Sequence, residues 1–365
     1  MIISSRQTGF RDKAMRIAVF LWIVIWAPAA SAQSTLSTWQ TQMVTKGTKV
    51  CQALQAAAAD PARADEALAA TYYDAIAVYR QIRAYTGSAQ PWTGCEATAY
   101  DVYVTRYVRR ADVNGGVPGY WIFTSGLRDR GDSVTVCLLA NKAAYAAPTT
   151  PVPWTDSPER VREVAYGLLA YVNCKAMTGQ VILQAAGGAP WQGKPRLPIL
   201  QTQLKAHMRY LFTGSSWQGS TVQVSPFMAG LGASALIEAN RMDPDPEIEP
   251  LLREVGDWLW TNAWLASARA MKYQINAGCG CGDPTAAPDL NQLIAPLYAW
   301  LWEQTGKVVH RDRAEQLFDG ATAGAWLDGA KQYNQNYVRS FDTVKRLRFV
   351  PGIPAAPTGL KLKLP

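Results

Sequence analysis

Three carboxylates occupy positions at which the sequence suggests acid–base chemistry. Asp289 directly precedes an uncharged apolar segment, and Glu163 is the last charged residue before another such segment. A carboxylate at the edge of a buried helix is costly to desolvate, which raises its pKa and suits it to act as a general acid. Both also have a structural interpretation, because aspartate commonly caps helices and Glu163 could pair with Arg160 or Arg162. Asp342 is a third candidate, held in reserve.

A second group of residues has the chemistry of ligand binding. Residues 331–342, KQYNQNYVRSFD, combine tyrosines and amides at unusual density, and several tryptophans lie in stretches rich in glycine and proline. Amides hydrogen-bond to hydroxyl groups and aromatic faces stack on apolar ring faces, although most such tryptophans fill the core. The residues that we expect to contact a ligand are Trp191, Trp217, Trp121, Asn291, Asn336 and Tyr337.

The cysteines and histidines match no metal-binding motif. The chain has six cysteines, including the Cys-Gly-Cys stretch at 279–281, and two histidines that lack the flanking residues of a zinc site. Disulfides are the more economical interpretation in an exported chain. We therefore expect disulfides and neither metal nor cofactor, while Cys174, inside an apolar segment, could be a free core thiol.

The first 32 residues have the organisation of a signal peptide. A basic start precedes the apolar run 17–26 and then Ala30-Ser31-Ala32, which predicts cleavage after Ala32. No later segment approaches the roughly 20 apolar residues of a membrane span, so we expect a secreted or periplasmic protein without stable membrane insertion. Removing four basic residues and one acidic residue lowers the net charge from +8 to +5. This mild, scattered excess argues against nucleic-acid binding.

Uncharged segments alternate with amphipathic segments along the chain. Residues 164–174, 222–237 and 290–302 contain no charged side chain, which predicts helices that are buried on most sides. In contrast, residues 247–260 and 311–327 place apolar side chains on one face and charges on the other. These two segments are therefore predicted to be surface helices with one packed face.

Recurring glycines divide the chain into helical hairpins. Gly87, Gly179 and Gly306 each follow a threonine at the end of a predicted buried helix, as left-handed helix caps do, and Asp243 takes the equivalent place. The spacing from Gly179 to Asp243 is 64 residues and from Asp243 to Gly306 is 63. A repeat of this length fits one hairpin of a buried and an exposed helix. We predict an all-α fold of about five to six such hairpins.

This organisation resembles the α/α-toroid, or six-hairpin glycosidase-like, carbohydrate-active proteins. The stretches that carry the resemblance most clearly are residues 225–260, a buried helix followed by an amphipathic one, and residues 289–306, a further buried helix. The resemblance implies a toroid over residues 33–349, with an inner and an outer ring of helices. The Pro-rich residues 350–365 resemble the start of a fibronectin type III module and are interpreted as a linker or a truncated remnant.

The resemblance also implies a polysaccharide or oligosaccharide as the partner. The expected reaction is hydrolysis by two carboxylates at the mouth of the toroid, where the three candidates above would lie. A polysaccharide lyase acting on an acidic glycan is the alternative, for which Tyr337, Asn336 and Arg339 supply a base and neutralising groups. A non-catalytic carbohydrate-binding toroid is the alternative outside enzymes.

Overall fold

The computed structural model describes residues 10–110, 117–146, 160–183, 192–212, 223–276 and 284–347, with side chains from Thr35 onward. Over these residues the secondary structure is almost entirely helical, which confirms the all-α class. The two antiparallel strand pairs contain two residues per strand. Helix packing therefore determines the fold.

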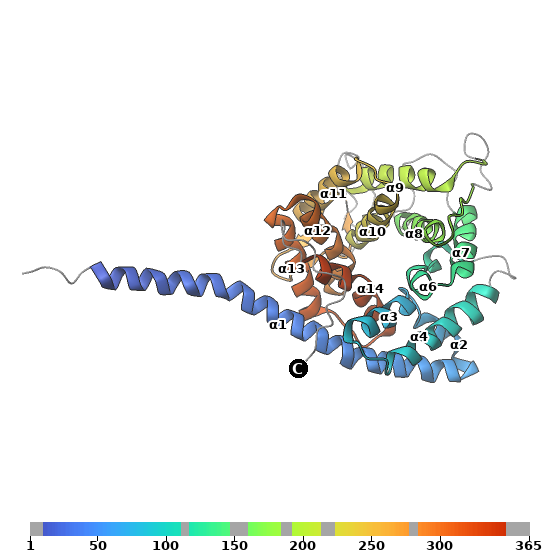
Figure 1. The fold of residues 1–365 in the computed structure, drawn as a ribbon, viewed down its shortest axis with the longest axis horizontal. Helices are drawn as coiled ribbons and strands as arrows, with labels where there is room; N and C mark the ends of the chain where they lie inside the picture. The colour runs from blue at the N-terminus through green and yellow to red at the C-terminus, as the bar shows by residue number, and fades with distance from the viewer. Residues whose placement is uncertain are drawn as a thin grey trace, which may run out of the picture.

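One set of helices lies around a common centre (Figure 1). Each helix of this set contacts the next in chain order, and the last contacts the first. We call them the inner helices: α3 (Ala75–Thr86), α6 (Ser125–Arg130), α8 (Arg160–Thr178), α10 (Pro226–Met242), α12 (Asn291–Thr305) and α14 (Ala330–Leu347).

A second set of helices packs on the outside of the inner helices (Figure 1). The outer helices are α1 (Phe10–Ala59), α4 (Trp92–Tyr100), α7 (Ser133–Ala146), α9 (Arg196–Phe212), α11 (Ile248–Ala263) and α13 (Val308–Gly324). Helix α4 contacts α3, α9 contacts α8, and α13 contacts α12. Helix α1 contacts α14, so the outer partner of the last inner helix comes from the start of the chain.

Short elements connect the helices. The helical ones are η1 (Pro61–Arg63), α2 (Ala64–Ala69), the π-helix η2 (Asp101–Val108), η3 (Gly119–Trp121) and η4 (Pro288–Leu290). The strands are β1 (Gln223–Val224), β2 (Trp264–Leu265), β3 (Ala270–Met271) and β4 (Ile275–Asn276), in which β1 pairs with β4 and β2 with β3.

The charge pattern of the sequence determines which helices are buried. Every residue of α12 from Asn291 to Trp302 is buried, as the absence of charge predicts. The predicted caps are also confirmed, because Gly87, Gly179 and Gly306 have positive φ angles of 68°, 71° and 64°. Glycine reaches this left-handed conformation without a steric penalty, so these residues end the inner helices α3, α8 and α12.

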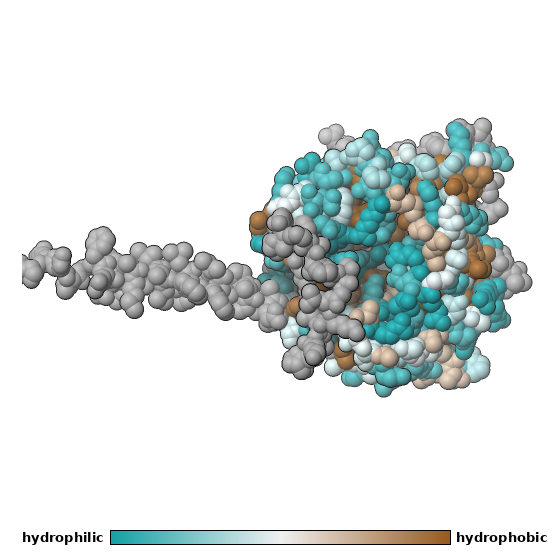
Figure 2. Space-filling view, in the orientation of Figure 1, coloured by the Kyte–Doolittle hydropathy of each residue, from teal (hydrophilic) through white to brown (hydrophobic). Residues whose placement is uncertain are grey.

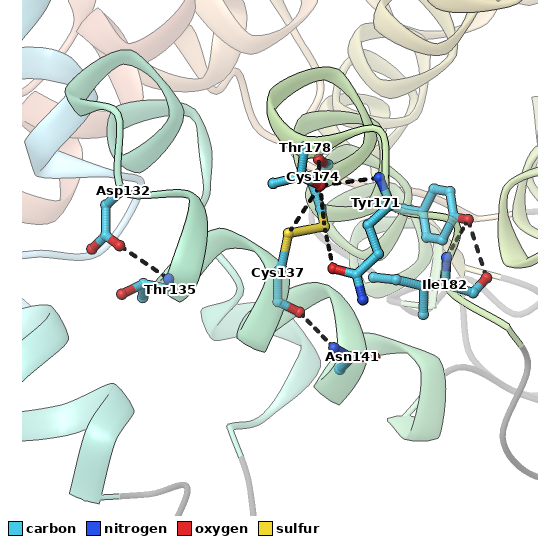
Figure 3. Close-up of a disulfide and its surroundings, with 9 residues drawn as sticks. Asp132, Thr135, Cys137, Asn141, Tyr171, Cys174, Thr178 and Ile182 are labelled. Carbon is cyan, nitrogen blue, oxygen red and sulfur yellow. Dashed lines mark hydrogen bonds between the residues drawn. A yellow bond between two sulfur atoms is a disulfide. The ribbon is translucent and has the colours of Figure 1, made fainter.

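Two disulfides tie outer helices to their neighbours. Cys51 in α1 pairs with Cys95 in α4 at a Cα–Cα distance of 5.5 Å. Cys137 in α7 pairs with Cys174 in α8 at 4.9 Å (Figure 3). The prediction that Cys174 could be a free thiol is therefore wrong, because α7 brings a second thiol to its helix. The Cys-Gly-Cys stretch at 279–281 lies outside the described residues.

The structure leaves the predicted ends of the domain untested. Helix α1 continues through the expected cleavage point after Ala32, and its described side chains enter the core from Trp39 onward. Among the described helices, none combines the length and apolarity needed to cross a membrane. Residues 350–365 lie outside the description.

Candidate functional site

Two pockets lie among the inner helices. We call the first the Tyr73 pocket and the second the Asp342 pocket. The lining of the Tyr73 pocket includes Tyr73, Asp74, Ser125, Tyr166, Leu231 and Arg339. The lining of the Asp342 pocket includes Ser234, Glu238, Pro296, Arg339, Asp342 and Arg346. Arg339 belongs to both and therefore marks their boundary.

One face of α14 supplies the charged groups of this interior. Arg339, Asp342 and Arg346 are three and four residues apart, so a helix brings them to the same side. All three line the Asp342 pocket. The middle of the face seen in Figure 2 is correspondingly covered mainly by hydrophilic residues. An apolar ring of helices thus encloses a polar centre.

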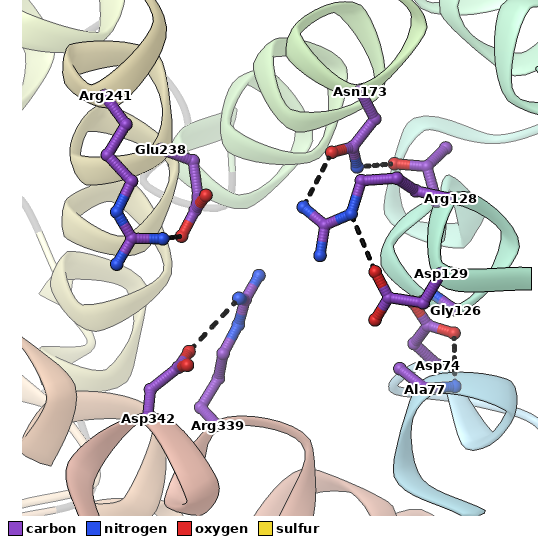
Figure 4. Close-up of polar contacts among 11 residues, drawn as sticks. Asp74, Ala77, Gly126, Arg128, Asp129, Asn173, Glu238, Arg241, Arg339 and Asp342 are labelled. Carbon is purple, nitrogen blue, oxygen red and sulfur yellow. Dashed lines mark hydrogen bonds and ion pairs between the residues drawn. The ribbon is translucent and has the colours of Figure 1, made fainter. Parts of the chain in front are cut away.

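The two carboxyl groups of the Asp342 pocket have different surroundings (Figure 4). Burial raises the pKa of Asp342, the positive charge of Arg339 opposes this, and the negative charge of Glu238 adds to it. The nearest guanidinium nitrogen of Arg339 is 3.7 Å from the Asp342 carboxylate, beyond hydrogen-bond distance. By contrast, Glu238 accepts a hydrogen bond of 2.8 Å from Arg241. A carboxyl group that tends to keep its proton therefore shares a pocket with a carboxylate that has a cationic partner.

The side chain of Asp342 is partly exposed although it lines a pocket. About two fifths of its side chain is accessible, since the exposed fraction is 40%. Asp342 also lines the pocket among α10, α12 and α14. Neighbouring protein atoms displace much of the water there, which is why desolvation is the main cause of the raised pKa.

A second polar cluster lies opposite, on α6 and α8 (Figure 4). Arg128 donates hydrogen bonds to Asp129 at 2.8 Å and to the Asn173 side chain at 3.0 Å. The Asn173 amide in turn donates to the hydroxyl of Thr124 at 2.9 Å. These contacts satisfy the polar groups of this side within the protein and hold α6 against α8.

The turn that enters α3 is strained. Tyr73 and Asp74 have φ angles of 63° and 59°, in the left-handed region that costs most residues about 1–3 kcal/mol each. The carboxylate of Asp74 accepts hydrogen bonds from the backbone N–H of Ala77 at 3.1 Å and of Gly126 at 3.0 Å. Burial raises the pKa of Asp74, and these two hydrogen bonds oppose that rise. Such strain is often found at functional sites, and here it presents Tyr73 to the pocket.

Two tyrosine hydroxyls complete the Tyr73 pocket. Burial raises the pKa of Tyr73 and of Tyr166 above the ordinary tyrosine range, so both hydroxyls are protonated at neutral pH. Neither hydroxyl forms a hydrogen bond with another residue in the described part of the chain. Both are therefore available as donors to a ligand.

The predicted pair Glu163 and Asp289 lines neither of the two pockets. Glu163 is in the first turn of α8, and Asp289 is in η4, where its carboxylate accepts a hydrogen bond of 3.1 Å from Gln335. The N-cap of α12 is Leu290, one residue later, so Asp289 does not begin that helix. Neither carboxylate is part of the lining of the Tyr73 pocket or of the Asp342 pocket. Their catalytic role stays a prediction, and of the three candidates only Asp342 faces a pocket described above.

Two of the predicted binding residues have their polar groups committed to backbone. Asn291 is fully buried, and its side chain bonds to the backbone of Met271, Arg269 and Leu317. The hydroxyl of Tyr337 donates to the backbone carbonyl of Trp39 at 3.1 Å. These contacts hold α12 and α14 to outer segments, which favours a structural role for both residues.

The other predicted binding residues have different outcomes. Asn336 is 1% exposed, and its amide nitrogen finds no hydrogen-bond partner among the described residues. Trp121 is half-buried and packs edge-to-face on Tyr72 at a ring-centroid distance of 4.9 Å. Trp191 and Trp217 lie outside the described residues, so their binding role stays a prediction.

The interior also contains groups that the sequence reasoning missed. Glu238 is the first charged residue after the apolar segment 222–237. Only the structure shows that it lines a pocket, from the C-terminal half of α10. Asp74 is visible in the sequence only as the residue before a helix. No cluster of three histidine, cysteine or acidic side chains that could hold a metal ion occurs in the described ranges. Comparison of the chain with protein-family models, curated proteins and solved structures finds no match.

Proposed function

We propose that the protein is an α/α-toroid of the six-hairpin, glycosidase-like type that hydrolyses a polysaccharide or oligosaccharide. The fold assignment is supported by the inner helices, which contact one another in a closed cycle. It is also supported by the outer helices, each of which packs against an inner helix. Contacts between α1 and α14 complete the sixth inner–outer pair. The same toroid serves several reactions, so the activity has to be argued from the site.

The observation that carries the activity is the carboxyl pair in the Asp342 pocket. Hydrolysis of a glycosidic bond uses one protonated carboxyl group and one carboxylate on either side of the scissile bond. Asp342, with its raised pKa, is the proposed general acid, and Glu238, paired with Arg241, is the proposed carboxylate. Two titratable groups whose surroundings differ in this way are typical of glycosidase sites.

The proposed location is the periplasm or the outside of the cell. The two disulfides, Cys51–Cys95 and Cys137–Cys174, support it because such bonds persist in oxidising compartments. The predicted signal peptide supports it independently. A polymer too large to enter the cytoplasm would meet the enzyme there.

A panel of polysaccharides tests the proposal through the release of reducing ends. Asp342→Asn and Glu238→Gln are each expected to lower the hydrolysis rate by about 10²–10⁴-fold, the usual size of an acid–base contribution. Asp328→Asn, which removes an exposed carboxylate that pairs with Lys46, is the matched control and should retain activity.

Other outcomes would identify the alternatives. If Glu163→Gln and Asp289→Asn abolish activity while Asp342→Asn does not, the reaction occurs at the pair first predicted from the sequence. An unsaturated product that absorbs in the ultraviolet would replace hydrolysis by a lyase reaction. Binding of a glycan without cleavage of any would leave a non-catalytic toroid.

A further inference from the structure

Three of the polar groups that line the Tyr73 pocket can donate hydrogen bonds and make none with the described residues. They are the guanidinium of Arg339 and the hydroxyls of Tyr73 and Tyr166. We propose that this pocket binds the carboxylate of an acidic sugar unit, with Arg339 as its anchor. The inference rests on the proposed function for the sugar, and on the pocket alone for the anion.

Arg339 is partly buried and makes no hydrogen bond with the described residues. Its side chain is only 13% exposed, and its nearest carboxylate is that of Asp342 at 3.7 Å. In the described part of the chain it donates no hydrogen bond, although a guanidinium has five N–H donors. The ion pair with Asp342 leaves the N–H donors of Arg339 without a hydrogen bond, whereas a carboxylate from a ligand could accept two parallel hydrogen bonds from the planar guanidinium.

The two tyrosines add neutral donors beside the cation. Because burial raises the pKa of both Tyr73 and Tyr166, neither phenol ionises at neutral pH, and neither adds negative charge that would repel an anion. Their hydroxyls and the Arg339 guanidinium line the same pocket. A ligand group that only accepts hydrogen bonds satisfies all three at once.

Asp74, the acidic residue that lines this pocket, does not occupy the position proposed for the anion. Both carboxylate oxygens of Asp74 accept backbone hydrogen bonds, from Ala77 and from Gly126. They are thereby directed to the chain rather than to Arg339. Asp342, on the other side of Arg339, lines the neighbouring pocket. A ligand carboxylate would therefore approach Arg339 from the side that no protein carboxylate occupies.

The walls of the pocket fit a sugar unit that carries such a group. Leu231, Leu169 and Val338 supply apolar surface, and Thr124 and Ser125 lie beside it. Apolar walls with a few convergent polar groups are the usual composition of small-ligand sites.

Calorimetric titration with galacturonate and galactose tests the proposal, because these sugars differ only in the carboxylate. The wild-type protein is expected to bind galacturonate at least about tenfold more tightly, the effect of one charge-assisted hydrogen-bonded pair. Arg339→Gln should remove this preference, and Arg339→Lys should retain part of it because the charge stays but the planar fork is lost. Arg253→Gln, on the outer helix α11, is the matched control and should leave it unchanged.

A second variant keeps the test independent of any change at Asp342. The double substitution Tyr73→Phe and Tyr166→Phe removes both hydroxyls but leaves the ion pair with Arg339, and it should weaken galacturonate binding several-fold. Equal affinity for the two sugars, or a preference that survives Arg339→Gln, would overturn the inference. Arg339-dependent binding of inorganic sulfate without binding of galacturonate would overturn the sugar carboxylate as the ligand.

The two proposals fail separately in these experiments. If the wild-type protein cleaves neutral glycans and shows no preference for galacturonate, hydrolysis stands and the acidic ligand is refuted. If it prefers galacturonate but releases no reducing end from any glycan, the anion site stands and the hydrolase is refuted.

Discussion

Loss of the Asp74 carboxylate should destabilise the protein by more than the loss of an ordinary helix cap. Asp74 accepts a hydrogen bond from Ala77 within its own helix, and a second from Gly126 at the start of another inner helix. Removing a cap costs about 0.5–2 kcal/mol, and leaving a buried N–H without a partner costs about 1–3 kcal/mol. Asp74→Ala is therefore expected to lower the free energy of unfolding by about 2–4 kcal/mol.

A matched cap elsewhere in the chain isolates the contact between helices. Asp60 caps η1 through a hydrogen bond of 2.9 Å from the backbone N–H of Ala62, but it is exposed and reaches no second helix. Asp60→Ala should cost about 1 kcal/mol or less. Asp74→Asn should give an intermediate loss, because Ala77 and Gly126 bond to different oxygens of Asp74 and the amide nitrogen that replaces one of them cannot accept a hydrogen bond.

Urea denaturation at neutral pH provides the assay, with the slope on denaturant as the check that unfolding exposes the same surface. The reasoning requires Asp74→Ala to lose at least about 1 kcal/mol more than Asp60→Ala, the smallest cost of the orphaned N–H of Gly126. Equal losses in the two variants would refute it, because the contact between α3 and α6 would then contribute nothing measurable.

Three further predictions concern stability. Replacing both Cys137 and Cys174 by alanine should lower the free energy of unfolding by about 4 kcal/mol, because the unfolded chain gains the entropy of an open loop. The two cysteines are 37 residues apart. A loss near zero in urea denaturation would contradict this. Gly230→Ala should lower the melting temperature, because a Cβ there would lie 2.7 Å from the carbonyl carbon of Leu293 and overpacking costs about 1–3 kcal/mol. An unchanged melting temperature would contradict this close approach of α10 and α12. Burial opposes the ionisation of Asp245, but hydrogen bonds, chiefly from Lys205 in α9, hold its pKa below the ordinary value. Its folded pKa lies below its unfolded pKa, so its stabilisation is present above the unfolded value and is lost as pH falls through the folded value. Asp245→Asn should therefore lower stability at neutral pH and have little effect below about pH 2–3; a loss of equal size at both pH values would contradict the ion pair.

The buried helices could be predicted because their signal is local. A helix surrounded by other helices excludes charge, so α12 is visible in the sequence as an uncharged segment closed by Gly306. The amphipathic pattern of α11 likewise identifies its packed face, since Leu251 and Leu259 are buried. Both patterns depend on neighbours within one helix and need no knowledge of the fold.

Contacts between distant parts of the chain could not be predicted in this way. The hydroxyl of Tyr333 donates to the backbone carbonyl of Met43, almost 300 residues earlier, and Tyr337 reaches Trp39 similarly. Such residues look like ligand-binding groups in the sequence because their polarity is unexplained locally. Their partners are backbone groups of α1, which no spacing rule identifies.

The candidate site combines a signal visible in the sequence with surroundings that only the fold creates. Asp342 was recognisable because it follows a polar helical stretch, but its raised pKa comes mainly from burial, and the charge of Glu238, which adds to it, lies on another helix, α10. Glu163 and Asp289 were chosen because they lie at helix starts, where the expected mouth would be. The Tyr73 pocket is also lined by residues at helix starts, Asp74 and Ser125, but these belong to α3 and α6.

The central claim is that burial raises the pKa of Asp342 and that the negative charge of Glu238 adds to this rise. The most direct measurement is an NMR titration of the Asp342 side-chain carboxyl carbon in the wild-type protein and in Glu238→Gln. The account predicts a wild-type pKa above the ordinary aspartate value of about 3.9, since burial is the main cause. Glu238→Gln should lower this pKa without returning it to the ordinary value. A wild-type pKa at or below the ordinary value, unaffected by Glu238→Gln, would contradict the proposed acid and carboxylate pair.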